Sequence, residues 1–315
     1  MQKFITPCVR ETYIKGLEEF FEIEYSQDYY HIIQSNKPLL VWNHLAFLVP
    51  GNFDENFNNN VKLRYKVWHY YKQNHLESYC IERGGFPNSV YVDSDGFCTE
   101  SKSYLKWKAH ETISNVEGYI KTLIESDITL EEQSNRQEIE YLKKVYKCED
   151  YEKVIFVPLQ VHNDITILIS SPTSVYNFLT AIYNLSTKNP KWLFLVKSHP
   201  LDKFTYEETD NFKNVESLHY KDCISLSESI VCINSGIGLQ ALAWNKKVYN
   251  IGKNYYVHDG LSKITTLEKL EEDIKFGYVP NYDNVKKFYS FLINVFYTSC
   301  NTKTFKFLEP IRLIK

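Results

Sequence analysis

Short apolar runs alternate with amphipathic stretches along the C-terminal half of the chain. The apolar runs, which predict buried strands, lie at residues 153–160, 192–200, 229–235 and 247–252, with a weaker one at 217–220. Helical patterns lie between them at residues 174–189 and 238–245, and Ser174 is a suitable N-cap for the first. Strands and helices that alternate at this spacing are typical of a doubly wound parallel sheet.

The N-terminal half shows a similar but less regular pattern. Its strand-like runs lie at residues 38–44, 78–85 and 89–97. Residues 66–75 have a helical pattern, and so do residues 103–147, whose charge-rich part (125–140) is predicted to be a solvated helix and its approach. Near residues 148–152 the helical pattern gives way to a strong strand pattern. We therefore predict the boundary between the two domains at these residues.

Length also favours two domains, because 315 residues exceed the size at which a single core usually stops growing. We therefore expect an α/β protein with an N-terminal domain at residues 1–150 and a C-terminal domain at residues 151–315. The apolar stretch at residues 285–299 is consistent with a last helix that packs back on the N-terminal domain, and equally with docking on a membrane.

Composition argues against several classes of function for this protein. A net charge of −3 gives no electrostatic reason to expect nucleic acid as a partner. The seven cysteines show no CxxC spacing, so we expect no structural zinc site. The odd cysteine count and the absence of a signal peptide or a bilayer-spanning run predict a cytoplasmic protein.

Polar residues follow the predicted strands of the C-terminal half, and ligands of open parallel sheets bind beyond the carboxyl ends of the strands. In INSGIGLQAL, a strand leads through Asn234, Ser235 and Gly236 into a helix. The backbone N–H groups at this helix start and the serine hydroxyl suit a phosphate. A plain strand-to-helix turn built from small residues explains the same pattern equally well.

Three further segments carry candidate chemistry. KSHP places Lys197 and His199 at a strand end, where the histidine could donate to a phosphate or serve as a structural residue. Gln160 and Asp164 follow the first strand of this half; the aspartate could act as a nucleophile or cap the next segment. Glu82 ends a strand of the N-terminal half and suits an acid/base role, although a surface glutamate before a Gly-Gly turn is the simpler interpretation.

These segments together resemble a known family. The blocks IFVPLQVHNDITILISSP, LVKSHP, ESIVCINSGIGLQALAWNKKVYNIGKNYYVHDGLS and ERGGFPNSVYVDSDGF are similar in order and spacing to the capsule-polysaccharide synthesis family of Kdo transferases. The resemblance covers residues 81–96 and 153–262. Four blocks in order are a more specific signal than any single dipeptide.

The resemblance implies a GT-B fold, in which two Rossmann-like domains flank a cleft, and transfer of Kdo from CMP-Kdo without a metal or other cofactor. It implies Asp164 as nucleophile of a retaining reaction, His199 and Ser235 as phosphate ligands, and Glu82 as acid/base. The predicted donor site comprises Gln160, Lys197, His199, Asn234, Ser235, Gly236 and Gln240. Many relatives carry glutamate where this chain has Gln240, and the amide can still hydrogen-bond a ribose hydroxyl, though without charge.

The expected partners are a nucleotide-sugar donor and a glycan or glycolipid acceptor, at or near the inner face of the membrane. Three alternatives remain open at this point. The donor could be another nucleotide sugar, such as CMP-sialic acid or a nucleotide diphosphate sugar. The chain could instead be an epimerase of similar fold, or a non-catalytic subunit of a glycan-assembly complex.

Overall fold

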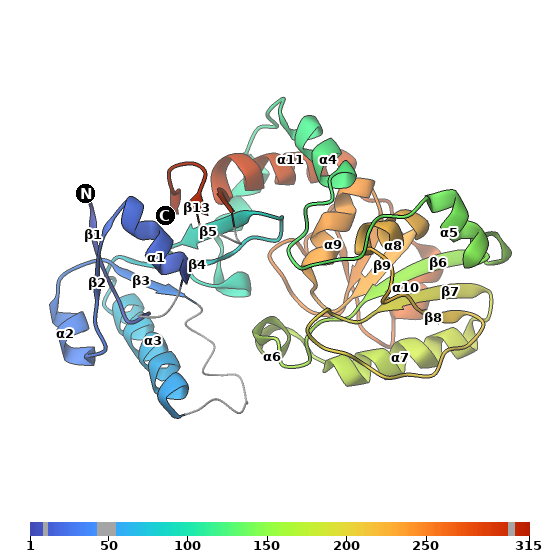
Figure 1. Ribbon diagram of the computed structural model, residues 1–315, viewed down its shortest axis with the longest axis horizontal. Helices are drawn as coiled ribbons and strands as arrows, with labels where there is room; N and C mark the ends of the chain where they lie inside the picture. Colours follow the sequence, from blue (N-terminus) through green and yellow to red (C-terminus); the bar gives the residue numbers. More distant parts are fainter. Residues whose placement is uncertain (9–11, 43–54, 302–305) are drawn as a thin grey trace. The chain divides into compact units, whose positions relative to one another are not determined.

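The computed structural model describes residues 1–8, 12–42, 55–301 and 306–315 (Figure 1). The chain forms two compact units. The first comprises Met1–Glu111 and Phe288–Lys315, and the second comprises Thr112–Lys287. This division differs from the predicted boundary near residue 150, because residues 112–150 pack with the second unit.

The second unit contains a six-stranded sheet whose strands are all parallel, in the order β11-β10-β9-β6-β7-β8. The strands are β6 (Lys153–Pro158), β7 (Trp192–Lys197), β8 (Phe212–Asn214), β9 (Ser229–Cys232), β10 (Lys247–Asn250) and β11 (Lys263–Ile264). This is the strand order of a Rossmann sheet, in which the chain direction across the sheet reverses between β6 and β9. The predicted doubly wound sheet is confirmed.

Helices cover both faces of this sheet (Figure 1). They are α4 (Val116–Glu125), α5 (Ile139–Val145), α6 (Ile165–Ser170), α7 (Val175–Lys188), α8 (Tyr220–Leu226), α9 (Gly236–Ala241) and α10 (Leu270–Phe276), with short 3-10 turns η5 (Cys148–Asp150) and η6 (Leu242–Trp244). The last helix, α11 (Tyr282–Phe291), includes the point in the chain at which the second unit ends and the first resumes. Val175, Phe178 and Ile182 of α7 are buried in the core against the strands. Ser174 caps α7 as predicted, since its Oγ accepts a hydrogen bond from the Asn177 N–H at 3.2 Å.

Two predictions in this unit were wrong. The weak strand expected at residues 217–220 is instead a turn that leads into α8, and β8 lies earlier, at Phe212–Asn214. The His219 side chain causes the difference, because its Nδ1 accepts a hydrogen bond from the Lys221 N–H and so caps the helix.

The second error is the charge-rich helix expected at residues 125–140. Residues 126–138 have no helical structure. The buried Lys221 ammonium binds the carbonyl oxygens of Leu123, Ser126 and Ile128, and the buried Asp222 carboxylate pairs with Arg136. These contacts satisfy the polar groups of an extended segment, which removes the need for intrahelical hydrogen bonds.

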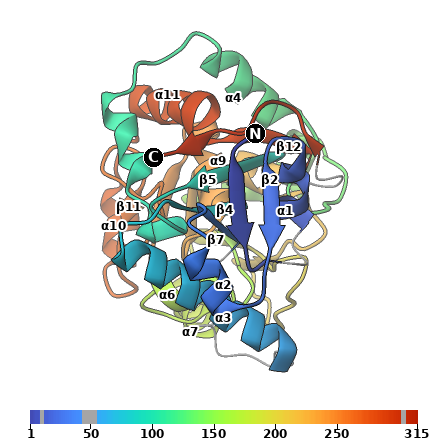
Figure 2. The same ribbon diagram turned by 90° about the vertical axis from the view of Figure 1, so that its left-hand side faces the viewer.

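The first unit contains an eight-stranded mixed sheet with the order β13-β12-β5-β4-β3-β1-β2, in which β14 also pairs with β5 (Figure 2). The strands are β1 (Lys3–Thr6), β2 (Glu22–Tyr25), β3 (Leu39–Trp42), β4 (Ser78–Arg83), β5 (Ser89–Asp93), β12 (Thr298–Asn301), β13 (Lys306–Phe307) and β14 (Leu313–Ile314). The first four are parallel, whereas β5 runs antiparallel to β4. The strand predicted at residues 38–44 is confirmed up to Trp42, and residues 43–44 lie outside the described residues.

The helical elements of the first unit are α1 (Thr12–Gly16), η1 (Leu17–Glu19), α2 (Tyr29–Gln34), α3 (Glu55–Gln73), η3 (Cys98–Glu100) and η4 (Ser103–Ala109). Together the two units have the architecture of the GT-B class, which confirms the predicted fold class.

The apolar C-terminal stretch belongs to the core of the first unit. Helix α11 continues into a π-helical turn, η7 (Leu292–Phe296). Phe288, Tyr289 and Leu292 are fully buried, and the Tyr289 ring lies 4.9 Å from that of Phe86. Packing within this unit therefore accounts for the apolar character of the stretch.

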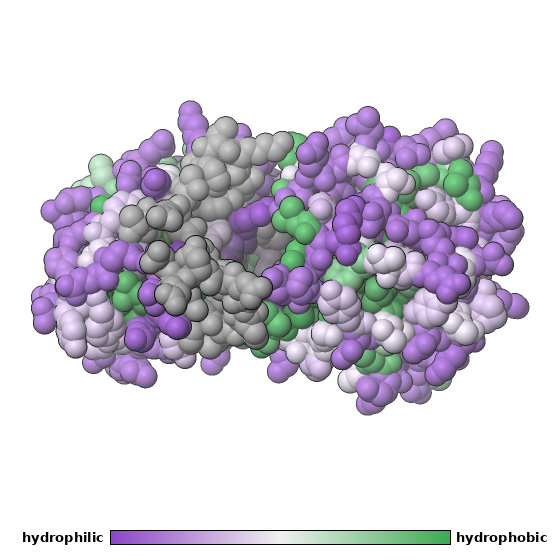
Figure 3. Space-filling view, turned by 60° about the horizontal axis from the view of Figure 1, so that its bottom comes forward, coloured by the Kyte–Doolittle hydropathy of each residue, from purple (hydrophilic) through white to green (hydrophobic). Residues whose placement is uncertain are grey.

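The surface mixes polar and apolar residues on the face that Figure 3 draws. On the face drawn in Figure 3, apolar residues form small separate groups among polar ones. Among the described residues, no helix combines the length and the apolar composition that a membrane crossing requires.

Candidate functional site

The candidate site lies at the carboxyl ends of β6 and β9, where the strand order of the second unit reverses. Ligands of doubly wound sheets bind at this switch point. The Gln160 side chain spans it: its Nε2 donates to Asn234 Oδ1 at 2.9 Å, and its Oε1 accepts from the Asn234 N–H at 3.1 Å. Both residues are buried, so the pair fixes the two strand ends relative to each other.

Asn234 also connects this pair to two neighbouring loops. Its Nδ2 donates to the carbonyl oxygens of Thr166 at 2.8 Å and Lys253 at 3.3 Å, and its own carbonyl accepts from Asn254 Nδ2 at 2.7 Å. Both amide hydrogens of Asn234 are thus used within the protein. The sequence predicted a direct donor contact for this residue, and the geometry gives its side chain a positioning role.

Asp164 lies in the loop after β6 and caps α6. Its Oδ1 accepts hydrogen bonds from the N–H and the Oγ1 of Thr166, both at 2.8 Å. The Thr166 carbonyl oxygen accepts a hydrogen bond from Asn234 Nδ2 at 2.8 Å, so Thr166 links the carboxylate to the Gln160–Asn234 pair. Among the described residues, Oδ2 of this half-buried aspartate makes no hydrogen bond, and it is the oxygen available for chemistry.

The start of α9, where the sequence predicted a phosphate site, has hydrogen-bond donors beside open space. Ser235 is its N-cap: Oγ accepts from the Ile237 N–H at 3.2 Å, which leaves the hydroxyl hydrogen to donate. A Cβ added at Gly236 would meet no atom within 4 Å, so there is open space beside the first helical N–H. Gly238 serves packing instead, because a Cβ there would lie 2.4 Å from the Tyr256 hydroxyl.

His199 follows β7 and is half-buried. Its Nδ1 accepts a hydrogen bond from the Leu201 N–H at 3.2 Å, which assigns the ring hydrogen of the neutral histidine to Nε2. Asp202 holds this loop against the loop after β6, since its Oδ2 accepts from the backbone N–H of His162 at 2.7 Å and contacts the His162 ring nitrogen Nδ1 at 2.8 Å.

Lys197 is oriented by a different set of contacts. Its Nζ donates to the carbonyl oxygen of Glu216 at 2.7 Å, and burial lowers its pKa. It lines a cavity of about 190 Å³ together with Ser198, Gln133 and Ser134. Gln133 Oε1 is buried in this wall without a hydrogen-bond partner among the described residues.

Gln240 and two residues that the sequence did not single out form a buried group beside α9. The Tyr220 hydroxyl donates to Gln240 Oε1 at 2.6 Å. The ring of His219 stacks on Tyr220 with centroids 5.1 Å apart. Burial, with a smaller contribution from the Arg136 guanidinium, lowers the pKa of His219 to about 4, so this ring is neutral at pH 7.

Glu82 lies in the first unit, on β4, directly opposite Tyr91 of β5. Its Oε1 accepts a hydrogen bond from the Arg83 N–H at 2.8 Å. The side chain is partly exposed at the end of the strand.

The structure therefore brings Gln160, Asp164, Asn234 and Ser235 together in the second unit, with His199 on the neighbouring strand end. The residues missed by sequence reasoning are those that hold this group in place: Thr166, Asp202, His219, Tyr220, Asn254 and Tyr256. Thr166, Asp202, Asn254 and Tyr256 follow predicted strands closely, whereas His219 and Tyr220 lay within the strand wrongly predicted at residues 217–220. Among the described residues, no three His, Cys, Asp or Glu side chains converge as metal ligands would.

Residues 95–275, more than half of the chain, match the family described as capsule polysaccharide biosynthesis protein. The chain belongs to this family. The match includes the loops after β6, β7 and β9, which carry the candidate site.

The chain is also similar in sequence to an individual curated protein. Over 150 residues the chain is 27% identical to Protein FixF of Sinorhizobium fredii (strain NBRC 101917 / NGR234), a match that covers 45% of this chain and 37% of FixF. The chain thus spans well under half the length of this curated relative.

Two solved structures share the fold of the whole chain. The beta Kdo 2,4 transferase of Thermosulfurimonas dismutans KpsC has a TM-score of 0.61 at 14% identity, covering 98% of this chain and 94% of that one. The beta Kdo 2,7 transferase of the same KpsC has a TM-score of 0.57 at 16% identity, with 98% and 95% covered. At this identity the likeness establishes the fold.

Proposed function

We propose that this protein transfers Kdo from CMP-Kdo to a glycan acceptor in capsule or lipopolysaccharide biosynthesis, with retention of anomeric configuration and without a metal. The observation that carries the proposal is the chain of hydrogen bonds from Asp164 through Thr166 to the Gln160–Asn234 pair at the switch point. It holds a carboxylate beside the start of α9, where a phosphate can bind. Family membership and the shared fold of two KpsC Kdo transferases support the choice of donor.

The phosphate of CMP would lie at the start of α9. Ser235 Oγ–H, the Gly236 N–H and His199 Nε2–H are donors of suitable type, and together with the helix start they would stabilise the negative charge that develops as CMP leaves. These donors would supply the charge stabilisation that a divalent cation supplies in other transferases.

The Asp164 carboxylate would then attack the anomeric carbon of Kdo. The new bond joins an oxygen of Asp164 to this carbon while the bond from the carbon to the CMP phosphate oxygen breaks, and CMP departs with the electron pair. Oδ1 remains bound to Thr166, so Oδ2 is the attacking atom.

In the second step, the acceptor hydroxyl oxygen would displace Asp164 from the anomeric carbon while its proton passes to a base. We assign this role to Glu82, which the family resemblance implies. Two displacements at one carbon restore the original configuration.

The experiment is a donor panel read by mass spectrometry. The protein is incubated with CMP-Kdo, CMP-sialic acid or a nucleotide diphosphate sugar, together with Kdo-containing glycan and glycolipid acceptors. We expect CMP release and an acceptor heavier by one Kdo residue only with CMP-Kdo, at a rate that EDTA does not change.

Each other outcome identifies a different function. Transfer from CMP-sialic acid would retain the fold assignment and replace the donor. Isomerisation or hydrolysis of a nucleotide sugar without acceptor would indicate an epimerase. Tight CMP binding with no turnover across the panel would indicate a non-catalytic subunit, and strict dependence on Mg²⁺ or Mn²⁺ would contradict the metal-free mechanism.

A further inference from the structure

The first unit contains a cavity of about 640 Å³ between α2 and the N-terminal half of α3. The lining residues that matter here are Tyr29, Tyr30, Asn59, Asn60, Lys62 and Lys66. None of them belongs to the candidate site of the second unit. The described lining includes aromatic rings, amides and two lysines but no acidic residue.

Tyr30 provides an exposed aromatic surface on one wall. It is 69% exposed, which is unusual for a tyrosine on a short helix. The Tyr29 ring supports it edge-on, with centroids 5.5 Å apart, and Tyr29 in turn contacts Tyr70 of α3 at 6.3 Å. An exposed ring with fixed neighbours can stack against the C–H face of a sugar at little entropic cost.

The opposite wall is one face of α3. Asn59, Lys62 and Lys66 are spaced at i, i+3 and i+7, so their side chains lie on the same side of the helix. Neither lysine forms an ion pair with any described residue. Amides bind pairs of sugar hydroxyls, and ammonium groups bind carboxylates or phosphates.

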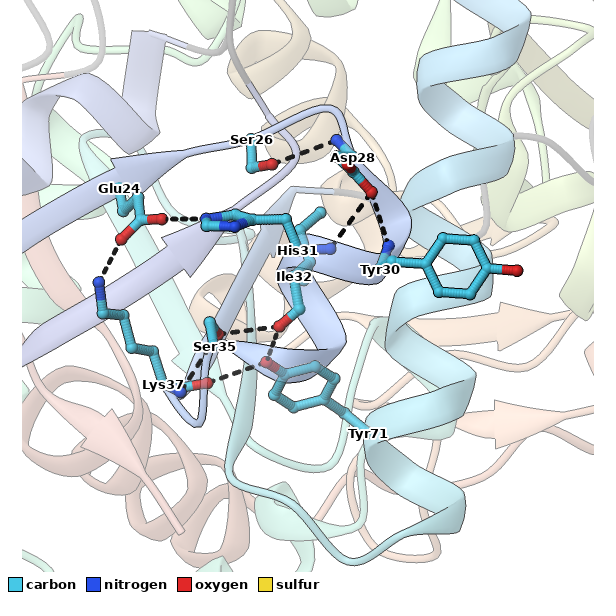
Figure 4. A network of polar contacts seen from close by, with 9 residues as sticks. All are labelled: Glu24, Ser26, Asp28, Tyr30, His31, Ile32, Ser35, Lys37 and Tyr71. Atoms are coloured by element: carbon cyan, nitrogen blue, oxygen red, sulfur yellow. Dashed lines mark hydrogen bonds and ion pairs between the residues drawn. The ribbon is translucent and has the colours of Figure 1, made fainter.

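A network of polar contacts holds α2 in place (Figure 4). Asp28 caps the helix by accepting hydrogen bonds from the N–H groups of Tyr30 at 2.8 Å and His31 at 3.2 Å. From α3, the Tyr71 hydroxyl lies 3.0 Å from the carbonyl oxygens of both Ile32 and Lys37. The two walls of the cavity are therefore connected to each other and preformed.

The Glu24 carboxylate of β2 is paired with two side chains of the first unit. Glu24 binds Lys37 and His31, and these two hydrogen bonds lower its pKa. The Asp28 carboxylate is likewise engaged, by the N–H groups at the start of α2. The described lining thus carries two lysines and no carboxylate, which favours an anionic ligand.

We propose that this cavity binds an acidic oligosaccharide, with a sugar ring stacked on Tyr30 and its carboxylate or phosphate held by Lys62 and Lys66. The ligand class follows from the cavity itself. That this oligosaccharide is the acceptor glycan is a further step, and that step rests on the proposed function.

The test is direct binding to the full-length protein without any nucleotide sugar. The probes are a short oligogalacturonate and a short oligosialic acid, each compared with its neutral methyl ester by calorimetry. We expect the acidic forms to bind more tightly than the esters and to lose affinity as ionic strength rises. Because no donor is present, the result is independent of whether the chain uses CMP-Kdo.

Variants locate the binding site. Tyr30→Ala should weaken binding about tenfold, whereas Tyr30→Phe should retain most of the affinity, because stacking requires only the ring. Lys62→Gln and Lys66→Gln should each reduce affinity about threefold to tenfold and flatten its salt dependence. The matched controls are Tyr141→Ala, at a tyrosine that is 57% exposed on α5, and Lys144→Gln; neither should change affinity.

Two results would overturn the proposal. One is that neither acidic probe binds more tightly than its ester. The other is that Tyr30→Ala and the two lysine variants bind as tightly as the wild type while remaining folded by circular dichroism.

Discussion

The sheet of the second unit is parallel throughout, whereas the sheet of the first unit changes direction after β4 and includes three strands from the C-terminus. A parallel sheet places all its carboxyl ends at one edge, so polar residues that follow successive strands meet there. The cavity between α2 and α3 is lined mainly by residues inside these two helices, and such residues carry no sequence marker comparable to a position just after a strand. This contrast explains why the candidate site of the second unit could be assembled from sequence motifs and the cavity of the first unit could not.

The two candidate carboxylates illustrate the same contrast. Asp164 is connected through Thr166 to the switch point of the parallel sheet. Glu82 lies at the end of β4, where its Oε1 accepts a hydrogen bond from the backbone N–H of Arg83. We therefore expect substitutions in the second unit to affect donor chemistry, and Glu82 substitution to affect only the acceptor step.

The largest effect should come from Asp164→Asn. Asparagine is as good an N-cap as aspartate, so α6 should remain intact, but the amide cannot act as the nucleophile. We expect turnover of CMP-Kdo to fall by several orders of magnitude, with unchanged CMP affinity in calorimetry. Thr166→Ser is the control, because it keeps the hydroxyl contact. A fully active Asp164→Asn protein would remove this residue from the mechanism.

Glu82→Gln should have the next largest effect. Removal of a general acid/base typically costs roughly 10²–10⁴ in rate. We expect this loss in the transfer rate while CMP affinity stays at the wild-type value, measured by product mass and calorimetry. If CMP affinity falls with the rate, the separation of donor and acceptor roles between the units is wrong.

His199→Ala should reduce both CMP affinity and turnover. A hydrogen bond to a charged group contributes about 1.5–3 kcal/mol, which corresponds to a loss of roughly 10- to 150-fold in affinity. His162→Ala is the matched control on the adjacent loop, since that histidine contacts Asp202. Wild-type CMP affinity in His199→Ala would make His199 a structural residue.

The smallest effect concerns stability and pH. The folded-state pKa of His219, about 4, lies below its ordinary value of 6.5, so the unfolded state binds more protons between these pH values. Stability should therefore fall as pH decreases through this window, by about 1–2 kcal/mol on going from pH 6.5 to roughly pH 5. Urea unfolding of His219→Gln should show a smaller decrease than the wild type, and an equal decrease would assign the pH dependence to other groups.

Sequence patterns predicted β6, β7, β9 and β10 because fully buried parallel strands are continuous apolar runs. They did not predict β8 correctly, because this strand has only three residues and its position depends on the cap at His219. The extended segment at residues 126–138 could not be predicted either. Its conformation depends on Lys221 and Asp222, which are about 90 residues away in the chain.

The candidate site, too, could be predicted only where local sequence determines the structure. Asp164, Ser235 and His199 were identified because each follows a strand. The positioning contacts of Asn234 and the tautomer of His199 depend on loop geometry, which local sequence does not encode. Aromatic residues around Tyr30 gave no signal, since the chain has 25 tyrosines and the sequence does not show which of them are exposed.

The most direct test of the central claim is amide hydrogen exchange of the intact protein with and without CMP, read by mass spectrometry of peptides. If the donor binds at the switch point of the parallel sheet, CMP will slow exchange in residues 159–166, 197–202 and 234–240. Peptides from the amino ends of the same strands, such as residues 188–193, will be unchanged. No protection in the three loops at saturating CMP, or protection confined to the amino-end peptides, would contradict the account.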